Sequence, residues 1–144
     1  MKKLAVFAAL LLFGAVLTAG TPSGWIDDFA KAQELARAEK RPMLVLFTGS
    51  DWCPYCVKLH KEVLAKAAFK KFAASRKLVL VYLDFPRKSK MPAETMQRNR
   101  KLASQYEVGG YPTTILFGAD GKEAGRLPGY SKQYIERLTR MLDK

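Results

Sequence analysis

The sequence has few of the residues that build covalently linked or metal-bound scaffolds. It contains two cysteines, Cys53 and Cys56, and one histidine, His60, among 144 residues. Two cysteines exclude a fold held by several disulfides, and no second cysteine pair completes a tetrahedral zinc site. No apolar run approaches the roughly 20 residues that a transmembrane helix needs. We therefore expect one small domain with an ordinary hydrophobic core.

Acidic residues are also scarce. There are 13 Asp and Glu against 25 Lys and Arg, which gives a formal net charge of +12 at pH 7. Such an excess can attract nucleic acid, an anionic membrane surface or acidic partners. The basic residues are spread along the chain, apart from short clusters such as Lys70-Lys71 and Arg87-Lys88, and this favours a solvated surface. An export signal at the N-terminus argues against a nucleic-acid partner.

That export signal lies at the very start of the chain. Two lysines precede an apolar run over residues 4–17, which is broken by one glycine and followed by small residues. An apolar core of about 7–15 residues is typical of a secretory signal peptide. We expect residues 1–20 to be a signal peptide cleaved near Ala19 or Gly20, and residues 21–144 to form a periplasmic or secreted domain. An uncleaved anchor and a short buried helix are the alternatives.

Hydrophobic spacing predicts alternating helices and strands after the signal segment. The first helix is expected to run from Trp25 to the Arg41-Pro42 pair, and further helices are expected over about 54–74, 92–106 and 131–142. We expect Asp27 or Asp28 to cap the first helix and Ser131 to cap the last one. Apolar runs predict strands at 43–48, 78–83 and 113–117, with a fourth returning after Asp120-Gly121. This order predicts an α/β fold with a central mixed β-sheet, parallel inner strands and helices on both faces.

The chemistry of the sequence is concentrated in Trp52-Cys53-Pro54-Tyr55-Cys56. A Cys-x-x-Cys pair directly after a buried strand, at the opening of a helix, is the context of a redox motif. Pro54 suits the first helical position, so Cys53 is expected at the N-cap, where unpaired amide hydrogens and the helix dipole favour a thiolate. We predict that Cys53 is the exposed attacking thiol and Cys56 the sheltered resolving thiol. Asp51 opposes the thiolate electrostatically.

Two other uses of the cysteine pair stay open at this point. One is a copper or zinc carrier that uses Cys53, Cys56 and His60, since the histidine lies four residues after Cys56 on the same helix. Structural zinc prefers four ligands, so the main prediction includes no metal and no other cofactor. The other use is a static disulfide clip, for which so short a loop gives little stabilisation.

A second signal, Gly109-Gly110-Tyr111-Pro112-Thr113, leads into the third strand. A proline just before a buried strand marks a fixed turn, and its peptide bond can be cis. Together with the strand, the Trp-Cys-x-x-Cys motif and the helix after it, this pattern resembles the thioredoxin family. It is similar in particular to secreted bacterial thioredoxin-like proteins and periplasmic thiol:disulfide interchange proteins. The resemblance covers about residues 25–144 and implies a thioredoxin fold.

The resemblance also implies roles for the residues of the site. Cys53 is then the nucleophile and Cys56 the resolving thiol of a redox-active disulfide. Pro112 is expected to be cis and to abut the cysteine pair, while the backbone of Tyr111 pairs with a substrate segment. The expected residues of the substrate groove are Trp52, Pro54, Tyr55, Tyr111 and Pro112.

Two departures from the family pattern concern proton transfer and redox potential. Cytosolic thioredoxins carry a buried carboxylate and a lysine beneath the cysteine pair, and we expect those positions to hold Leu46 and Leu80. Protons must then reach Cys56 from water or another group. The Pro-Tyr dipeptide between the cysteines resembles that of glutaredoxins, which are less reducing than thioredoxin.

The sequence thus predicts an exported thiol:disulfide oxidoreductase that acts through Cys53-Pro-Tyr-Cys56. Disulfide-bearing exported proteins are the expected partners, reduction is the preferred direction, and a membrane protein is expected to supply the electrons. About 124 mature residues leave no room for the dimerisation region of an isomerase, so we expect a monomer. The interval from Cys56 to Pro112 is too short for the helical insertion usual in strong oxidases of this fold.

Overall fold

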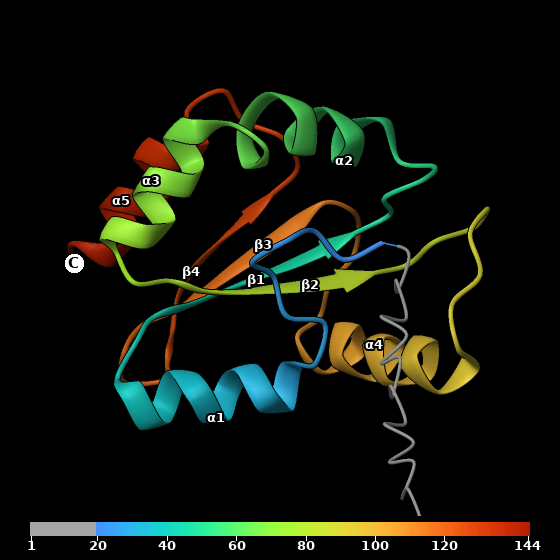
Figure 1. Ribbon diagram of the computed structural model, residues 1–144, viewed down its shortest axis with the longest axis horizontal. Coiled ribbons are helices and arrows are strands. Elements are labelled where there is room, and N and C mark those ends of the chain that lie inside the picture. The colour runs from blue at the N-terminus through green and yellow to red at the C-terminus, as the bar shows by residue number, and fades with distance from the viewer. Residues whose placement is uncertain (1–19) are drawn as a thin grey trace, which may run out of the picture.

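Four strands form one sheet, in the order β2-β1-β3-β4, in the computed structural model, which describes residues 20–144 (Figure 1). The predicted signal peptide, apart from Gly20, lies outside the described residues. β1 pairs in parallel with β2 and antiparallel with β3, and β3 pairs antiparallel with β4. The strands are β1 (Met43–Thr48), β2 (Val79–Asp84), β3 (Thr113–Phe117) and β4 (Glu123–Pro128). The expected mixed sheet is confirmed.

The expectation of parallel inner strands is wrong, because the inner strands β1 and β3 are antiparallel. β2 ends at Asp84, which lies beside Thr48, and β3 begins at Thr113, which lies beside Phe47. The connection between β2 and β3 therefore leaves and re-enters the sheet at the same end. A strand that enters there can only run back against β1.

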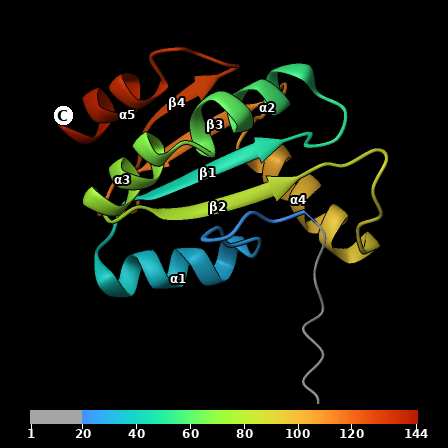
Figure 2. The same ribbon diagram turned by 45° about the horizontal axis from the view of Figure 1, so that its top comes forward.

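Helices cover both faces of the sheet, as expected. α1 and α4 lie on one face, and α2, α3 and α5 lie on the other (Figures 1 and 2). None of the helices in the described part of the chain has the length and hydrophobicity that a bilayer crossing requires. The helices are α1 (Phe29–Glu39), α2 (Pro54–Leu59), the π-helix η1 (His60–Leu64), α3 (Ala67–Ser75), α4 (Ala93–Gln105) and α5 (Tyr134–Leu142).

The helix ends agree only in part with the sequence signals. The Asp28 side chain caps α1 by accepting the Lys31 amide, and the helix expected over about 54–74 is interrupted at Lys66, whose extended backbone separates η1 from α3. Ser131 does not cap α5. This helix begins only after Gln133, and the Ser131 hydroxyl instead accepts the Gln133 amide in the turn before it.

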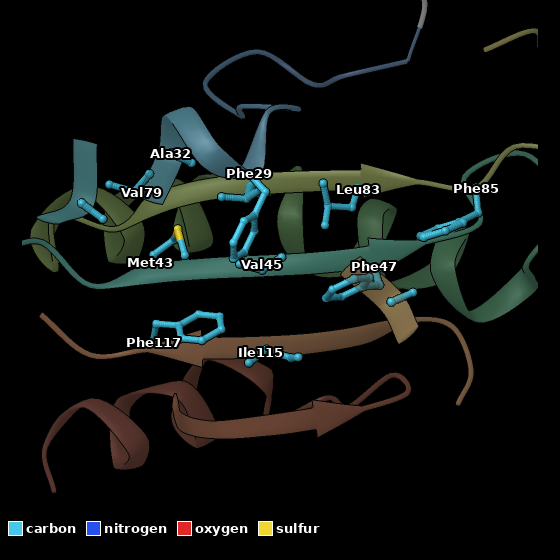
Figure 3. Close-up of a cluster of buried hydrophobic side chains, with 13 residues drawn as sticks. Phe29, Ala32, Met43, Val45, Phe47, Val79, Leu83, Phe85, Ile115 and Phe117 are labelled. Carbon is cyan, nitrogen blue, oxygen red and sulfur yellow. The ribbon is translucent and has the colours of Figure 1, made fainter. Parts of the chain in front are cut away.

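Hydrophobic side chains form one layer on each face of the sheet. Met43, Val45 and Phe47 point toward α1 and α4, where they pack with Phe29 and other residues of the cluster in Figure 3. The alternate residues of β1 pack on the other face against α2, η1, α3 and α5. All six residues of β1 are buried, which explains its uninterrupted apolar sequence.

Trp25 does not belong to the first helix, contrary to the prediction. Its ring lies on the opposite face of the sheet, with ring centroids 6.1 Å from Phe69 and 5.8 Å from Tyr82. The next residue, Ile26, donates its amide to Leu80 and accepts the Tyr82 amide. Because this bridge extends the chain along the edge of β2, the helix begins only after Asp28.

Candidate active site

A disulfide joins Cys53 and Cys56 at the start of α2. Cys53 is the N-cap residue, and its sulfur accepts the Cys56 amide at 3.3 Å, while Pro54 occupies the first turn. Proline loses nothing there because the first amides of a helix have no partner within it. The predicted local geometry of the motif is therefore present.

Both sulfurs are covered in this disulfide state. Cys53 is 5% exposed and Cys56 3%, so the expectation of an exposed Cys53 is wrong for this form. The turn before Pro112 covers Cys53, whose Sγ lies 3.5 Å from the Tyr111 carbonyl oxygen. Cys56 Sγ instead accepts the Gly49 amide at 3.3 Å. The two sulfurs thus differ in what they contact rather than in how much of them is exposed.

The predicted groove residues from distant parts of the chain meet beside Cys53. The Tyr111–Pro112 peptide bond is cis, as the resemblance implies. The Trp52 ring meets the Tyr111 ring edge-on at 5.9 Å, and Phe85 stacks on Tyr111 at 4.8 Å. Pro54 and Tyr55 lie on the solvent side of α2, where Tyr55 is 63% exposed.

The loop after β2 is fastened to the cysteine motif through Asp51, a contact that the sequence did not reveal. The carboxylate accepts the amides of Arg87, Lys88 and Ser89 at 2.7–2.9 Å and the Ser89 hydroxyl at 2.7 Å. These hydrogen bonds hold the pKa of Asp51 well below its ordinary value, and the bond from the Arg87 amide has the largest effect. Asp51 therefore acts as an anchor for the loop, in addition to opposing a thiolate at Cys53.

Trp52 forms the second attachment of this loop. Its indole Nε1 donates to the Phe85 carbonyl at 2.7 Å. The Arg87 guanidinium lies over the indole, 3.6 Å from the ring centroid, at a distance typical of a cation–π contact. The only signal taken from this loop in the sequence was the basic pair Arg87-Lys88, which does not indicate these contacts.

Asp84 is the one buried charged residue among residues 20–144. Its carboxylate accepts the Ser50 amide at 3.0 Å, the Ser50 hydroxyl at 2.6 Å and the Phe85 amide at 2.9 Å. Ser50 follows Gly49, whose amide donates to Cys56 Sγ, so Asp84 holds the turn that contacts the Cys56 sulfur. Burial, and after it the charge of Asp84, raise the pKa of the Tyr82 phenol to about 12. A hydrogen bond from Ser50 lowers this pKa, but by less than the other two effects raise it.

A hollow of about 470 Å³ has Cys56 in its lining. Ser50, His60 and Tyr82 line it, and Nδ1 of His60 is buried without a hydrogen-bond partner. Leu46 and Leu80 both belong to the apolar layer on the α2 face of the sheet. A proton acceptor or donor for Cys56 is thus available in water or in the polar groups of this hollow.

The metal alternative receives no support from the structure. No group of three or more His, Cys, Asp and Glu side chains is placed to hold a metal ion in the described part of the chain. Both cysteine sulfurs are joined to each other, and His60 lines the hollow beside Cys56.

Comparisons with known proteins agree with this site. Residues 29–144 match the family described as a thioredoxin-like domain. The chain is 36% identical over 115 residues to the disulfide bond reductase DsbH of Chlamydia pneumoniae, an alignment that covers 78% of this chain and 69% of the relative. It is 28% identical over 140 residues to the thioredoxin-related protein DsbJ of the same organism, covering 92% of this chain and 40% of the relative.

A solved structure of a DsbH oxidoreductase supports the fold. It superposes with a TM-score of 0.71 at 32% identity, and the match covers 90% of this chain and 94% of that one. The expected arrangement of a mixed sheet between two helical layers is thus the one found in this relative.

Proposed function

Because the chain belongs to the thioredoxin-like family and is a thiol:disulfide oxidoreductase, we propose that it reduces disulfides of exported proteins through Cys53 and Cys56. The name of the related disulfide bond reductase supports this direction. The mature protein acts as a monomer in the periplasm or outside the cell. A membrane protein re-reduces the Cys53–Cys56 disulfide after each cycle.

The reaction consists of two sulfur exchanges. In the reduced protein the Cys53 thiolate attacks one sulfur of a substrate disulfide, and the other substrate sulfur leaves as a thiolate that takes up a proton. The Cys56 thiol then loses its proton and attacks Cys53 Sγ in the mixed disulfide, which releases the second substrate thiolate. Two electrons pass to the substrate, its two sulfurs take up one proton from Cys56 and one from solvent, and the Cys53–Cys56 disulfide remains.

The observation that carries this proposal is the position of Cys53 Sγ. It lies at the N-cap of α2, accepts the Cys56 amide and is 3.5 Å from the Tyr111 carbonyl. Amide donors and the helix dipole stabilise a thiolate at this point. The Tyr111 backbone, with Trp52 beside it, gives a substrate segment a place to pair next to the sulfur that attacks.

Trapping of mixed disulfides tests the assignment of the two cysteines. A Cys56→Ala variant, expressed as the full chain, should retain exported proteins on Cys53, because the second exchange is removed. Non-reducing gels and mass spectrometry identify these adducts. The Cys53→Ala and double Ala variants are the matched controls and should trap nothing. Trapping by neither single variant would instead identify the pair as a static clip.

The direction of exchange and the export of the chain are tested in cells. Rapid acid quenching and alkylation should find the cysteine pair mostly reduced, whereas an oxidase would hold it mostly as a disulfide. The mature protein should begin near Gly20 or Thr21 in its measured mass and appear in the exported fraction. A disulfide-locked pair in untreated cells would contradict the reductase direction.

A further inference from the structure

We propose that four basic residues beside the groove, Arg87, Lys88, Lys90 and Arg100, select disulfides flanked by acidic residues in the substrate polypeptide. We call this set the basic rim. The inference rests on the proposed function, since it assigns a substrate class to the same groove. It adds the chemistry that distinguishes one disulfide-bearing segment from another.

Arg87 is the member of the basic rim that lies closest to the groove wall. Its guanidinium stacks on the Trp52 ring, which fixes the cation beside the ring that meets Tyr111. The ion pairs found among residues 20–144 involve Arg41, Arg76, Arg98 and Arg126. Within residues 20–144, the donors at the edge of the Arg87 guanidinium therefore form no ion pair with a carboxylate, and a stacked arginine can still bind one from a partner.

Arg100 is an exposed arginine of α4 and the second arginine of the basic rim. It lies on α4 directly after Asn99, whose buried side chain donates to the Asp84 carbonyl at 3.0 Å. Burial raises the pKa of the Tyr111 phenol, and the charges of Arg100 and Arg87 lower it again. Both arginines thus act on Tyr111, whose backbone carbonyl lies next to Cys53.

The loop that carries Arg87, Lys88 and Lys90 is held by a carboxylate of the chain itself. Asp51 accepts three of its amides and one hydroxyl, so the backbone is fixed while the three basic side chains remain exposed. Because its hydrogen bonds are directed to the loop backbone, Asp51 leaves the side-chain donors free. The loop carries three basic residues against this one carboxylate, so its excess charge is positive.

A polypeptide fits this surface better than a small disulfide. Pairing with the Tyr111 backbone would orient an extended segment so that residues near its cysteine pass the Trp52 and Arg87 side. An Asp or Glu near that cysteine can then reach the basic rim. Exposed ion pairs and charge steering together should change kcat/KM by about 3- to 10-fold.

The test uses three disulfide peptides of equal length, which carry Glu, Gln or Lys on both sides of the cysteine. The reduced mature protein should reduce the Glu peptide about 3- to 10-fold faster, in kcat/KM, than the Lys peptide. This Glu-to-Lys ratio should fall at 0.5 M salt and approach one in the Arg87→Gln/Arg100→Gln variant. Lys70→Gln/Lys71→Gln, which removes the same two positive charges from exposed residues of α3, should keep the wild-type ratio.

Binding without redox chemistry separates this inference from the proposed function. The same peptides with Ser in place of Cys, labelled for fluorescence anisotropy, should bind the oxidised wild type in the order Glu, Gln, Lys. This order supports the acidic preference even if no peptide is reduced. Equal binding of all three, or a preference unchanged in the double variant, would overturn it. If the three peptides bind equally and the protein co-sediments with phosphatidylglycerol vesicles, the basic rim would be assigned to a lipid surface instead.

Discussion

The two sulfurs of the disulfide are almost equally buried, yet their surroundings differ. Cys53 Sγ lies beside the Tyr111 carbonyl, next to the edge-on pair of the Trp52 and Tyr111 rings. Cys56 Sγ meets the Gly49 amide, in a turn that Asp84 holds from inside the fold. The two sulfurs therefore differ in their partner groups rather than in exposed area, and in the proposed function this difference distinguishes the attacking sulfur from the resolving one.

The largest expected effect is a difference in reactivity between the reduced cysteines. At pH 6, Cys53 should be alkylated by iodoacetamide about 100-fold faster than Cys56, since thiolates at helix N-termini form readily and buried thiols do not. Mass spectrometry of partly alkylated protein gives both rates in one sample. Equal rates, or a Cys53 no faster than a free cysteine, would remove the distinction between the two sulfurs.

Removing the Asp84 carboxylate should disturb the surroundings of Cys56. Asp84→Ala leaves the Ser50 amide and the Ser50 hydroxyl without this acceptor, while the Phe85 amide keeps the Thr48 carbonyl at 2.8 Å. Buried donors without partners are costly, so the free energy of unfolding in urea should fall by about 2 kcal/mol. The rate of Cys53 alkylation should change less than the rate at which Cys56 resolves a mixed disulfide.

Ser50→Ala is the matched control for this variant. It removes only the Ser50 hydroxyl from Asp84 and keeps both amides in place. The expected loss is about 1 kcal/mol, near the value of a single hydrogen bond. A Ser50→Ala loss as large as that of Asp84→Ala would show that the carboxylate does not organise the turn through the two amides.

The outer parts of this site followed from local sequence patterns. Neighbours within one or two helical turns determine the Cys53 cap, the place of Pro54 at the helix start and the sheltered position of Cys56. The cis bond before Pro112 came from the family resemblance, not from the residues alone. In these places a short stretch of chain, or a known relative, contains the needed information.

The inner contacts could not be predicted because they join residues far apart in the chain. Asp84 lies 34 positions from Ser50, and the amides held by Asp51 lie 36–38 positions from it. Nothing local distinguishes these two aspartates from solvated ones. Trp25 shows the same limit, since its helical spacing was overridden by the backbone pairing of Ile26 along β2. Tertiary contacts decided each case.

A methyl group at Gly49 would affect the surroundings of both cysteines at once. A Cβ built there would lie 2.5–2.7 Å from the Trp52 ring. Gly49→Ala should move the indole away from Phe85 and Arg87 and lower the free energy of unfolding by about 1–2 kcal/mol. Tryptophan fluorescence and urea unfolding measure the two effects. Gly109→Ala, where a Cβ meets nothing within 4 Å, is the control and should leave both unchanged.

The smallest effect concerns the loop that Asp51 anchors. Asp51→Asn keeps the shape but removes the charge that accepts the amides of Arg87, Lys88 and Ser89, so these amides should lose protection against hydrogen exchange. Because the folded pKa of Asp51 is lowered, its contribution to loop stability is complete above its ordinary value of 3.8 and is lost only as the pH falls through the lower folded pKa.

Wild-type protection factors at these three amides should therefore stay constant from pH 6 down to about pH 4, where ordinary carboxylates begin to protonate, and should decline only below it. In Asp51→Asn they should be lower throughout and show no such decline. Asp120→Asn makes the same charge change in the turn before β4 and should leave the loop amides as they are. Equal protection in wild type and Asp51→Asn would mean that Trp52 alone holds the loop against the groove.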